Sequence, residues 1–138
     1  MEILIDTNVV LDWLLDREPF VEQANQIMRY CVRGKVKGYL ASHSILNIFY
    51  ITRGAFDTEK RKEIALMLCD KFNVIGLDKQ MIIESLGNKN WDDLEDGLQI
   101  LCAVAEGLDY IITRDPKGFE TSKVQALSPK AFLEMIEG

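Results

Sequence analysis

The regular alternation of short apolar runs with longer stretches of helical periodicity restricts the fold of this chain more than any other feature of its sequence. The short runs have the length of strands, and in each following stretch apolar residues recur at the spacing of one helix face. No linker, internal repeat or low-complexity segment interrupts this order. Strands that alternate with helices build a sheet whose two faces are both covered. We therefore predict an α/β fold, a three-layer α/β/α sandwich with a central, mainly parallel sheet.

Capping residues, prolines and glycines set the expected limits of these elements. Pro19 opens one helix and Gly34 ends it, while Asp92 and Glu95 have the spacing of a capping box for the helix that Gly107 ends. The expected strands span residues 2–5, 37–41, 73–77, 110–113 and 124–127. The expected helices span residues 8–15, 19–33, 42–53, 57–72, 79–86 and 92–107, and a last helix begins at Ser128-Pro129.

Length and the absence of long apolar segments limit the domain organisation. The chain has 138 residues, close to the commonest size of one domain, so we expect a single domain over residues 1–138. Its opening residues lack the basic segment and long apolar run of a signal peptide, and no stretch is long enough to cross a bilayer. We expect a cytoplasmic protein with no membrane partner.

The cysteine, histidine and charge counts limit the metals and partners that the chain can bind. Cys31, Cys69 and Cys102 are widely separated, and His43 is the only histidine. A zinc site of thiolate and imidazole ligands would need all of them, so any metal here should be held by oxygen. The formal net charge of −6 disfavours binding to nucleic-acid phosphates. That inference weakens if several of the acids bind a divalent cation.

Four acids are expected to meet at one edge of the predicted sheet. Asp6 follows the first strand and Asp115 follows the fourth. Asp96 lies in the first turn or so of a helix, on the same face as Asp93 three residues before it. Each acid also has a structural alternative, since Asp can cap a helix or shape a turn. Together, however, they would offer magnesium or manganese the oxygen ligands that these ions prefer, at the strand ends where parallel sheets bind ligands.

Three segments carry these acids in a distinctive order. The first is Leu4-Ile-Asp6-Thr-Asn-Val, and the second is Asp93-Leu-Glu-Asp96-Gly-Leu-Gln99, followed by Ala103 to Gly107. The third is Ile112-Thr113-Arg114-Asp115 through Phe119. They resemble the opening motif, the central acidic helix and the last motif of the PIN-domain ribonucleases, a family that includes the VapC-like toxins of bacterial and archaeal toxin–antitoxin pairs. Each segment alone is weak evidence, but three in order on matching elements are fairly specific.

This resemblance implies a PIN-like fold and an endoribonuclease that depends on magnesium or manganese. The implied catalytic acids, which would hold the metal, are Asp6, Asp96 and Asp115. Other polar side chains would hydrogen-bond to these carboxylates and orient them, namely Thr7 or Asn8, and Thr113. The metal would activate a water for attack on an RNA phosphodiester. As partners, the resemblance implies an RNA substrate, an antitoxin and a second copy of the chain in a homodimer.

One position departs from the pattern of the family. Many members carry a glutamate in the helix that begins near Ser42, and the matching residue here is Asn47. An amide oxygen can still bind a metal or its water, but it has no charge, so we expect weaker metal affinity. The related subgroup with an Asp-Phe-Glu-Asp type helix often has this asparagine. Asp93 would then replace the missing charge as a further metal ligand.

Two other functions remain open on the sequence alone. A degenerate PIN module would bind RNA or protein without cleaving, which the neutral Asn47 and the acidic net charge favour. A phosphotransferase of the haloacid dehalogenase type also places an Asp after its first strand, but it requires a second Asp where this chain has Asn8. Near the site, we expect Glu95 to belong to the capping box. Arg114 would contact a phosphate or pair with an acid such as Glu95, and Asp12 would face solvent or an adjoining helix.

Overall fold

Five parallel strands form the centre of the computed structural model, which describes residues 1–138. They are β1 (Glu2–Ile5), β2 (Lys37–Ala41), β3 (Asn73–Ile75), β4 (Tyr110–Ile112) and β5 (Gln125–Leu127), in the order β3-β2-β1-β4-β5. Every neighbouring pair is parallel. The register pairs Ile5 of β1 with Ile112 of β4, so the residues that follow these two strands emerge side by side at one edge of the sheet.

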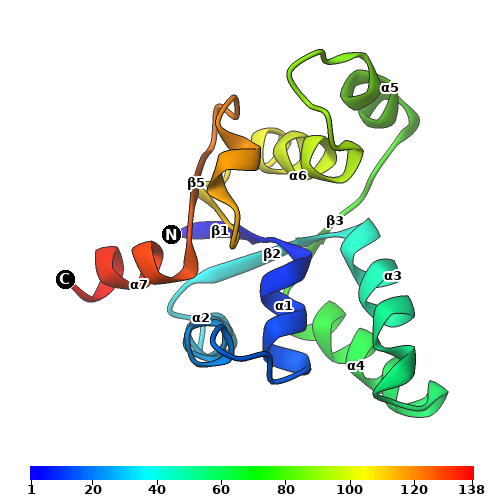
Figure 1. The fold of residues 1–138 in the computed structure, drawn as a ribbon, viewed down its shortest axis with the longest axis vertical. Coiled ribbons are helices and arrows are strands. Elements are labelled where there is room, and N and C mark those ends of the chain that lie inside the picture. The colour runs from blue at the N-terminus through cyan, green and yellow to red at the C-terminus, as the bar shows by residue number, and fades with distance from the viewer.

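Helices cover both faces of this sheet (Figure 1). The seven α-helices are α1 (Thr7–Leu14), α2 (Val21–Val32), α3 (Ser42–Ile51), α4 (Thr58–Lys71), α5 (Lys79–Gly87), α6 (Leu94–Ala105) and α7 (Pro129–Glu137). Two 3-10 helices, η1 (Thr52–Gly54) and η2 (Pro116–Phe119), lie in the connections. In Figure 1, α1, α2 and α4 lie below the sheet, and α5 and α6 lie above it. The predicted α/β sandwich with a central parallel sheet is confirmed.

The middle strand, β1, is buried because its alternate side chains enter two different cores. Ile3 and Ile5 pack with residues of α1, α2, α4 and α7 on one face. Leu4 points to the other face, where it packs with Ile100 and other residues around α6. None of these three strand side chains has exposed surface. A strand enclosed in this way holds the residue that follows it, Asp6, in a defined place.

Most boundaries lie within one residue of the expected ones, and the larger differences occur in α2, α3 and α6 and at the end of β3. Residues 18–20 form a turn, so α2 begins at Val21 rather than at Pro19. The helix expected over residues 42–53 ends at Ile51, where the chain tightens into η1. No helix is both long and apolar enough to cross a lipid bilayer.

The start of α6 differs from expectation because a different acid caps it. The helix begins at Leu94, and its N-cap is Asp93 rather than Asp92. Asp93 Oδ1 accepts a hydrogen bond of 3.0 Å from the backbone N–H of Asp96. Glu95 does not return to the cap, so the expected capping box of Asp92 and Glu95 is wrong. This cap anchors the first turn of α6 at the edge of the sheet where β1 and β4 end.

Candidate functional site

Asp6 stands at the carboxyl end of β1, between that strand and α1. Its backbone N–H donates to the carbonyl of Ile112 at 2.9 Å, which continues the ladder to β4. The side chain is 6% exposed and makes no capping hydrogen bond to α1. Its Oδ2 instead accepts a hydrogen bond of 2.8 Å from the hydroxyl of Thr113, which follows β4. Asp6 therefore occupies the N-cap position of α1 without a capping hydrogen bond from its side chain, and Thr113 holds the carboxylate in place.

Asp96 and Asp115 approach each other at Gly118. Asp96 Oδ2 lies 3.0 Å, and Asp115 Oδ2 lies 3.6 Å, from the position that a Cβ atom at residue 118 would occupy. Glycine leaves this space open for the two carboxylates. The backbone N–H of Asp115 also donates to Thr113 Oγ1 at 3.2 Å. One hydroxyl, that of Thr113, therefore ties both Asp6 and the Asp115 loop to the end of β4.

A cavity of about 170 Å³ opens at this edge of the sheet. Residues from the starts of α1 and α6 and from α3 line it, namely Asp6, Thr7, Asn8, Asn47, Ile51, Asp93, Glu95 and Asp96. The structure thus brings Asp6, Asp93 and Asp96 together with Asn47 around one cavity. Asp115 lies outside this lining but beside Asp96. We call this space the acidic cavity.

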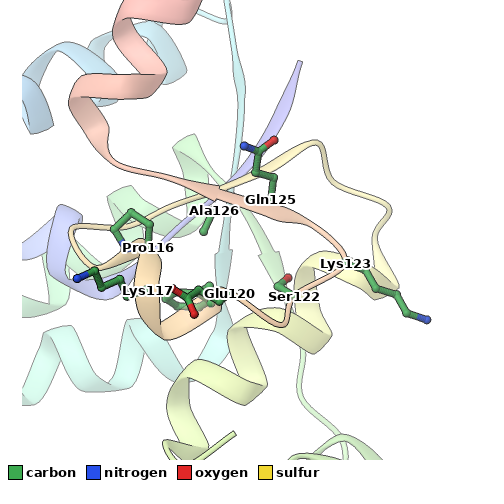
Figure 2. A pocket seen from close by; sticks show the side chains of 8 residues that line it. Pro116, Lys117, Glu120, Ser122, Lys123, Gln125 and Ala126 are labelled. Carbon is green, nitrogen blue, oxygen red and sulfur yellow. The ribbon is translucent and has the colours of Figure 1, made fainter. Parts of the chain in front are cut away.

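A second hollow, of about 350 Å³, lies between η2 and β5 (Figure 2). Lys117 and Lys123 lie at opposite ends of it in Figure 2, with Gln125 at its upper rim. It contains none of the predicted site residues, and its only carboxylate is that of Glu120. Although it is larger than the acidic cavity, it lacks the oxygen donors that a divalent cation needs. The acidic cavity is therefore the candidate site.

Burial and mutual repulsion perturb the acids of this cavity. Burial, followed by the charges of Asp93, Asp6, Glu95 and Asp115, raises the pKa of Asp96 from 3.8 to about 7. The pKa of Asp6 is also raised, first by burial and then by Glu95 and Asp93, against the lowering effect of the Thr113 hydrogen bond. No lysine or arginine forms an ion pair with any of the four predicted acids. Gathered acids without a basic partner are a common property of functional sites.

The donor types of the acidic cavity fit magnesium or manganese, which prefer carboxylate and amide oxygens and usually keep several waters. The side chains do not by themselves form a closed coordination shell, since no three acidic, histidine or cysteine residues are spaced to enclose an ion. The candidate ligands of such an ion are Asp6, Asp96, Asp115 and one oxygen of Asp93, although in this arrangement they are not spaced to enclose it. Water would have to complete its coordination.

Glu95 is a residue of the cavity that sequence reasoning placed elsewhere. Its Oε1 accepts a hydrogen bond of 3.1 Å from the hydroxyl of Thr7, and it lies 4.0 Å from His43 Nε2. Burial lowers the pKa of His43, against the opposing charge of Glu95. The sequence signal for Glu95 was present, because it lies directly before Asp96 in the acidic helix. The same position also suits a helix cap, which is the role that the sequence predicts for it.

Arg114 does not line the acidic cavity, and it pairs with an acid, as one of the two expectations held, but that acid is Asp12 rather than Glu95. Its Nε lies 2.8 Å from Oδ2 of Asp12, whose side chain is 1% exposed. The guanidinium also stacks over the ring of Phe20, 4.2 Å from its centroid. Burial raises the pKa of Asp12, while Arg114 and Arg17 oppose that shift. Asp12 is thus buried rather than facing solvent, and its pairing with the partly exposed Arg114 joins α1 to the residue before Asp115 and so supports the loop that carries that acid.

Without metal, we expect Asp96→Asn to become increasingly more stable than the unmodified protein as the pH rises from 3.8 to about 7. Over this interval the folded protein keeps a proton on Asp96 that the unfolded chain releases, so rising pH favours unfolding. Urea unfolding in chelator at several pH values measures the difference. Asp92→Asn, at an exposed neighbour, should show no such trend. A constant difference between Asp96→Asn and the unmodified protein would contradict the raised pKa.

Comparison with known proteins supplies independent findings. A family model described as PIN domain matches residues 2–117. Ribonuclease VapC1 of Aquifex aeolicus (strain VF5) is 25% identical over 137 residues, which cover 96% of this chain and 94% of that relative. A solved toxin–antitoxin complex from Klebsiella pneumoniae is 22% identical, with a TM-score of 0.68 and coverage of 92% of this chain and 97% of that chain. VapBC2 from Rickettsia felis, solved with a DNA fragment from its promoter, is 13% identical, with a TM-score of 0.66 and coverage of 93% and 98%. The two solved structures share the fold described above.

Proposed function

This chain belongs to the PIN-domain family, and from that premise we propose that the protein is a divalent-metal-dependent endoribonuclease, the toxin of a toxin–antitoxin pair. The observation that carries the proposal is the gathering of Asp6, Asp93 and Asp96 around one cavity without a basic partner, where burial and neighbouring charges also raise the pKa of Asp96 to about 7. A divalent cation is the group that relieves such repulsion. The ribonuclease name of the Aquifex relative supports RNA as the substrate.

The proposed catalytic acids and metal ligands are Asp6, Asp96 and Asp115. Asp93 would add a fourth carboxylate through the oxygen that does not cap α6. Bound magnesium or manganese would supply an activated water and a positive charge beside the phosphodiester. Thr113 orients two of these acids through its hydroxyl. Thr7 and Asn8 line the cavity from the first turn of α1, where Asn8 offers an amide to water or substrate.

A manganese-soaked crystal of the protein tests this proposal most directly. We expect anomalous scattering from manganese between Asp6, Asp96 and Asp115, together with metal-dependent cleavage of single-stranded RNA. Asp6→Asn should lose the anomalous peak but keep the fold. A crystal of the unmodified protein without manganese at this place, at millimolar metal, would contradict the proposed site.

The neutral Asn47 in the acidic cavity supports our assignment of the chain to the subgroup with an Asp-Phe-Glu-Asp type helix, in which Asp93 supplies the missing charge. We expect Asn47→Glu to tighten manganese binding, because the new carboxylate adds attraction for the cation. The same charge would be repelled by Asp6 and Asp96 in the metal-free protein and should lower its melting temperature.

Calorimetric titration with manganese and thermal melts in chelator measure the two effects of Asn47→Glu. Metal affinity and metal-free stability should move in opposite directions. Asn47→Gln, which lengthens the side chain without adding charge, is the matched control and should change neither strongly. If Asn47→Glu leaves both quantities unaltered, Asn47 does not belong to the metal site.

The proposed partners are an antitoxin, as in the solved toxin–antitoxin complexes, and a second copy of this chain. Exposed apolar side chains on α3 support the homodimer, since Leu46 is 72% exposed and Tyr50 63% exposed beside the acidic cavity. Light scattering of the purified protein would show a single-chain mass if this part of the proposal is wrong. We also propose that the protein acts in the cytoplasm, where RNA substrates are present. Residues 1–138 would form one domain.

One alternative function has support in the structure. The uncharged Asn47 and the absence of a closed carboxylate shell favour a degenerate module that binds RNA or protein without cleaving. RNA binding without cleavage in saturating manganese would establish it. A phosphotransferase of the haloacid dehalogenase type has no such support, because the chain belongs to the PIN-domain family and has Asn8 where a second Asp is required.

A further inference from the structure

Four polar side chains beside the acidic cavity form a continuous chain of hydrogen bonds. Gln99 Nε2 lies 3.1 Å from Ser44 Oγ, and Ser44 Oγ lies 2.8 Å from Thr7 Oγ1. Thr7 Oγ1 lies 3.1 Å from Glu95 Oε1. Gln99 and Ser44 have no exposed surface, and Thr7 is 4% exposed. The chain runs from α6 to α3, from α3 to α1, and from α1 back to α6.

The donors and acceptors in this row of hydrogen bonds can all be satisfied in one direction only. Glu95 ends it with a carboxylate that accepts and does not donate, so the single hydroxyl proton of Thr7 goes to Glu95. Ser44 must then donate its own proton to Thr7 and accept one from the amide of Gln99. If the Gln99 amide were turned so that its oxygen accepted from Ser44, the two hydroxyl protons of Ser44 and Thr7 would have to form three hydrogen bonds. A donor amide at residue 99 is therefore required to complete the chain.

Each of the four hydrogen-bonded residues lies within three positions of a proposed site residue in the same segment. Thr7 follows Asp6, and Glu95 precedes Asp96. Ser44 lies one helical turn before Asn47, and Gln99 lies one turn after Asp96. A shift of α3 relative to α1 or α6 would break a buried hydrogen bond, which is costly because no solvent can replace it, while the link from Thr7 to Glu95 is partly buried. The chain therefore couples the relative positions of the elements that carry the acids.

We propose that Gln99 and Ser44 are positioning residues of the acidic cavity, which hold Thr7 and Glu95 and thereby the first turns of α1, α3 and α6 in the arrangement that binds the metal. This inference rests on the proposed function. Neither residue lines the cavity, so neither contacts metal or substrate. A buried network that served the fold alone would affect stability but not metal affinity.

The test compares Ser44→Ala and Gln99→Met with Ser85→Ala. Methionine keeps the length of glutamine but removes its amide donor. Ser85 is the matched control, because it is also buried and its hydroxyl also contacts α6, 3.3 Å from the Leu94 carbonyl, outside the chain. The readouts are manganese affinity by calorimetry without RNA, the free energy of unfolding in chelator, and kcat and KM for RNA cleavage.

We expect Ser44→Ala and Gln99→Met each to weaken manganese binding and to lower kcat by about tenfold or more, as loss of groups that orient metal ligands does. KM for RNA should remain nearly the same, because neither side chain contacts the substrate. Ser85→Ala should lose stability but keep the manganese affinity and kcat of the unmodified protein.

Unaltered manganese affinity and kcat in Ser44→Ala, with a loss of stability like that of Ser85→Ala, would overturn the positioning role while the proposed function stands. Ser44→Ala removes a single buried atom, so it decides the question even if Gln99→Met does not fold. If the unmodified protein neither binds manganese nor cleaves RNA, the proposed function fails first, and this inference fails with it.

Discussion

Asp96→Asn is expected to lower the rate of RNA cleavage by about a hundredfold or more, the scale of loss when one preorganised charge is removed from a reacting centre. Asp96 lies among four other carboxylates, and burial, followed by repulsion from their charges, raises its pKa to about 7. Asparagine keeps the size of the side chain but not the charge that a divalent cation would neutralise. Initial rates on single-stranded RNA with magnesium or manganese measure the loss.

Two controls separate loss of chemistry from loss of structure. Asp92→Asn removes one charge from an exposed neighbour in the same segment and should keep most of the activity. Asp96→Asn should also fold, since it relieves repulsion in the metal-free protein. Excess chelator should stop cleavage by the unmodified protein. Full activity of Asp96→Asn, or equal cleavage in chelator, would show that the metal mechanism is wrong.

Arg114→Met is expected to lower the free energy of unfolding by about 3 kcal/mol, because it leaves the charge of Asp12 buried without its main partner. Asp12 is 1% exposed, and its remaining partner, Arg17, is more distant at 3.8 Å. Methionine keeps an apolar chain over Phe20, so the change removes mainly the charge. The loss should be smaller at acid pH, where Asp12 becomes protonated, since Arg114 lowers its pKa.

Urea unfolding at neutral and acid pH measures this effect, and Arg53→Met is the matched control. Arg53 also stacks on an aromatic ring, 3.9 Å from the centroid of Tyr50, but it pairs with no acid. It should lose less than about 1 kcal/mol. The double variant Asp12→Asn with Arg114→Met should recover part of the loss. A decrease for Arg114→Met as small as that for Arg53→Met would refute the buried pair.

Much of the fold could be read from local patterns, because periodicity and capping depend on residues that are near one another in the chain. The strands β1 and β2 begin and end as the apolar runs predict, and Gly107 closes the α6 turn with a φ of 62°. Local patterns failed where two neighbours compete for one role. Asp92 and Asp93 have the same side chain, and only the path of the backbone into α6 decides that Asp93 caps the helix.

The sequence by itself determined the α/β class and the acids that follow β1 and β4, because strand polarity places the ends of parallel strands at one edge of the sheet. Only the tertiary structure decided the partners of these and other polar groups. It turned Glu95 to Thr7, buried Asp12 against Arg114, and enclosed Gln99 beside Ser44. These partners are 88, 102 and 55 residues apart in the chain. The pairing of these polar groups therefore depends on strand register and helix packing, and no local pattern encodes it.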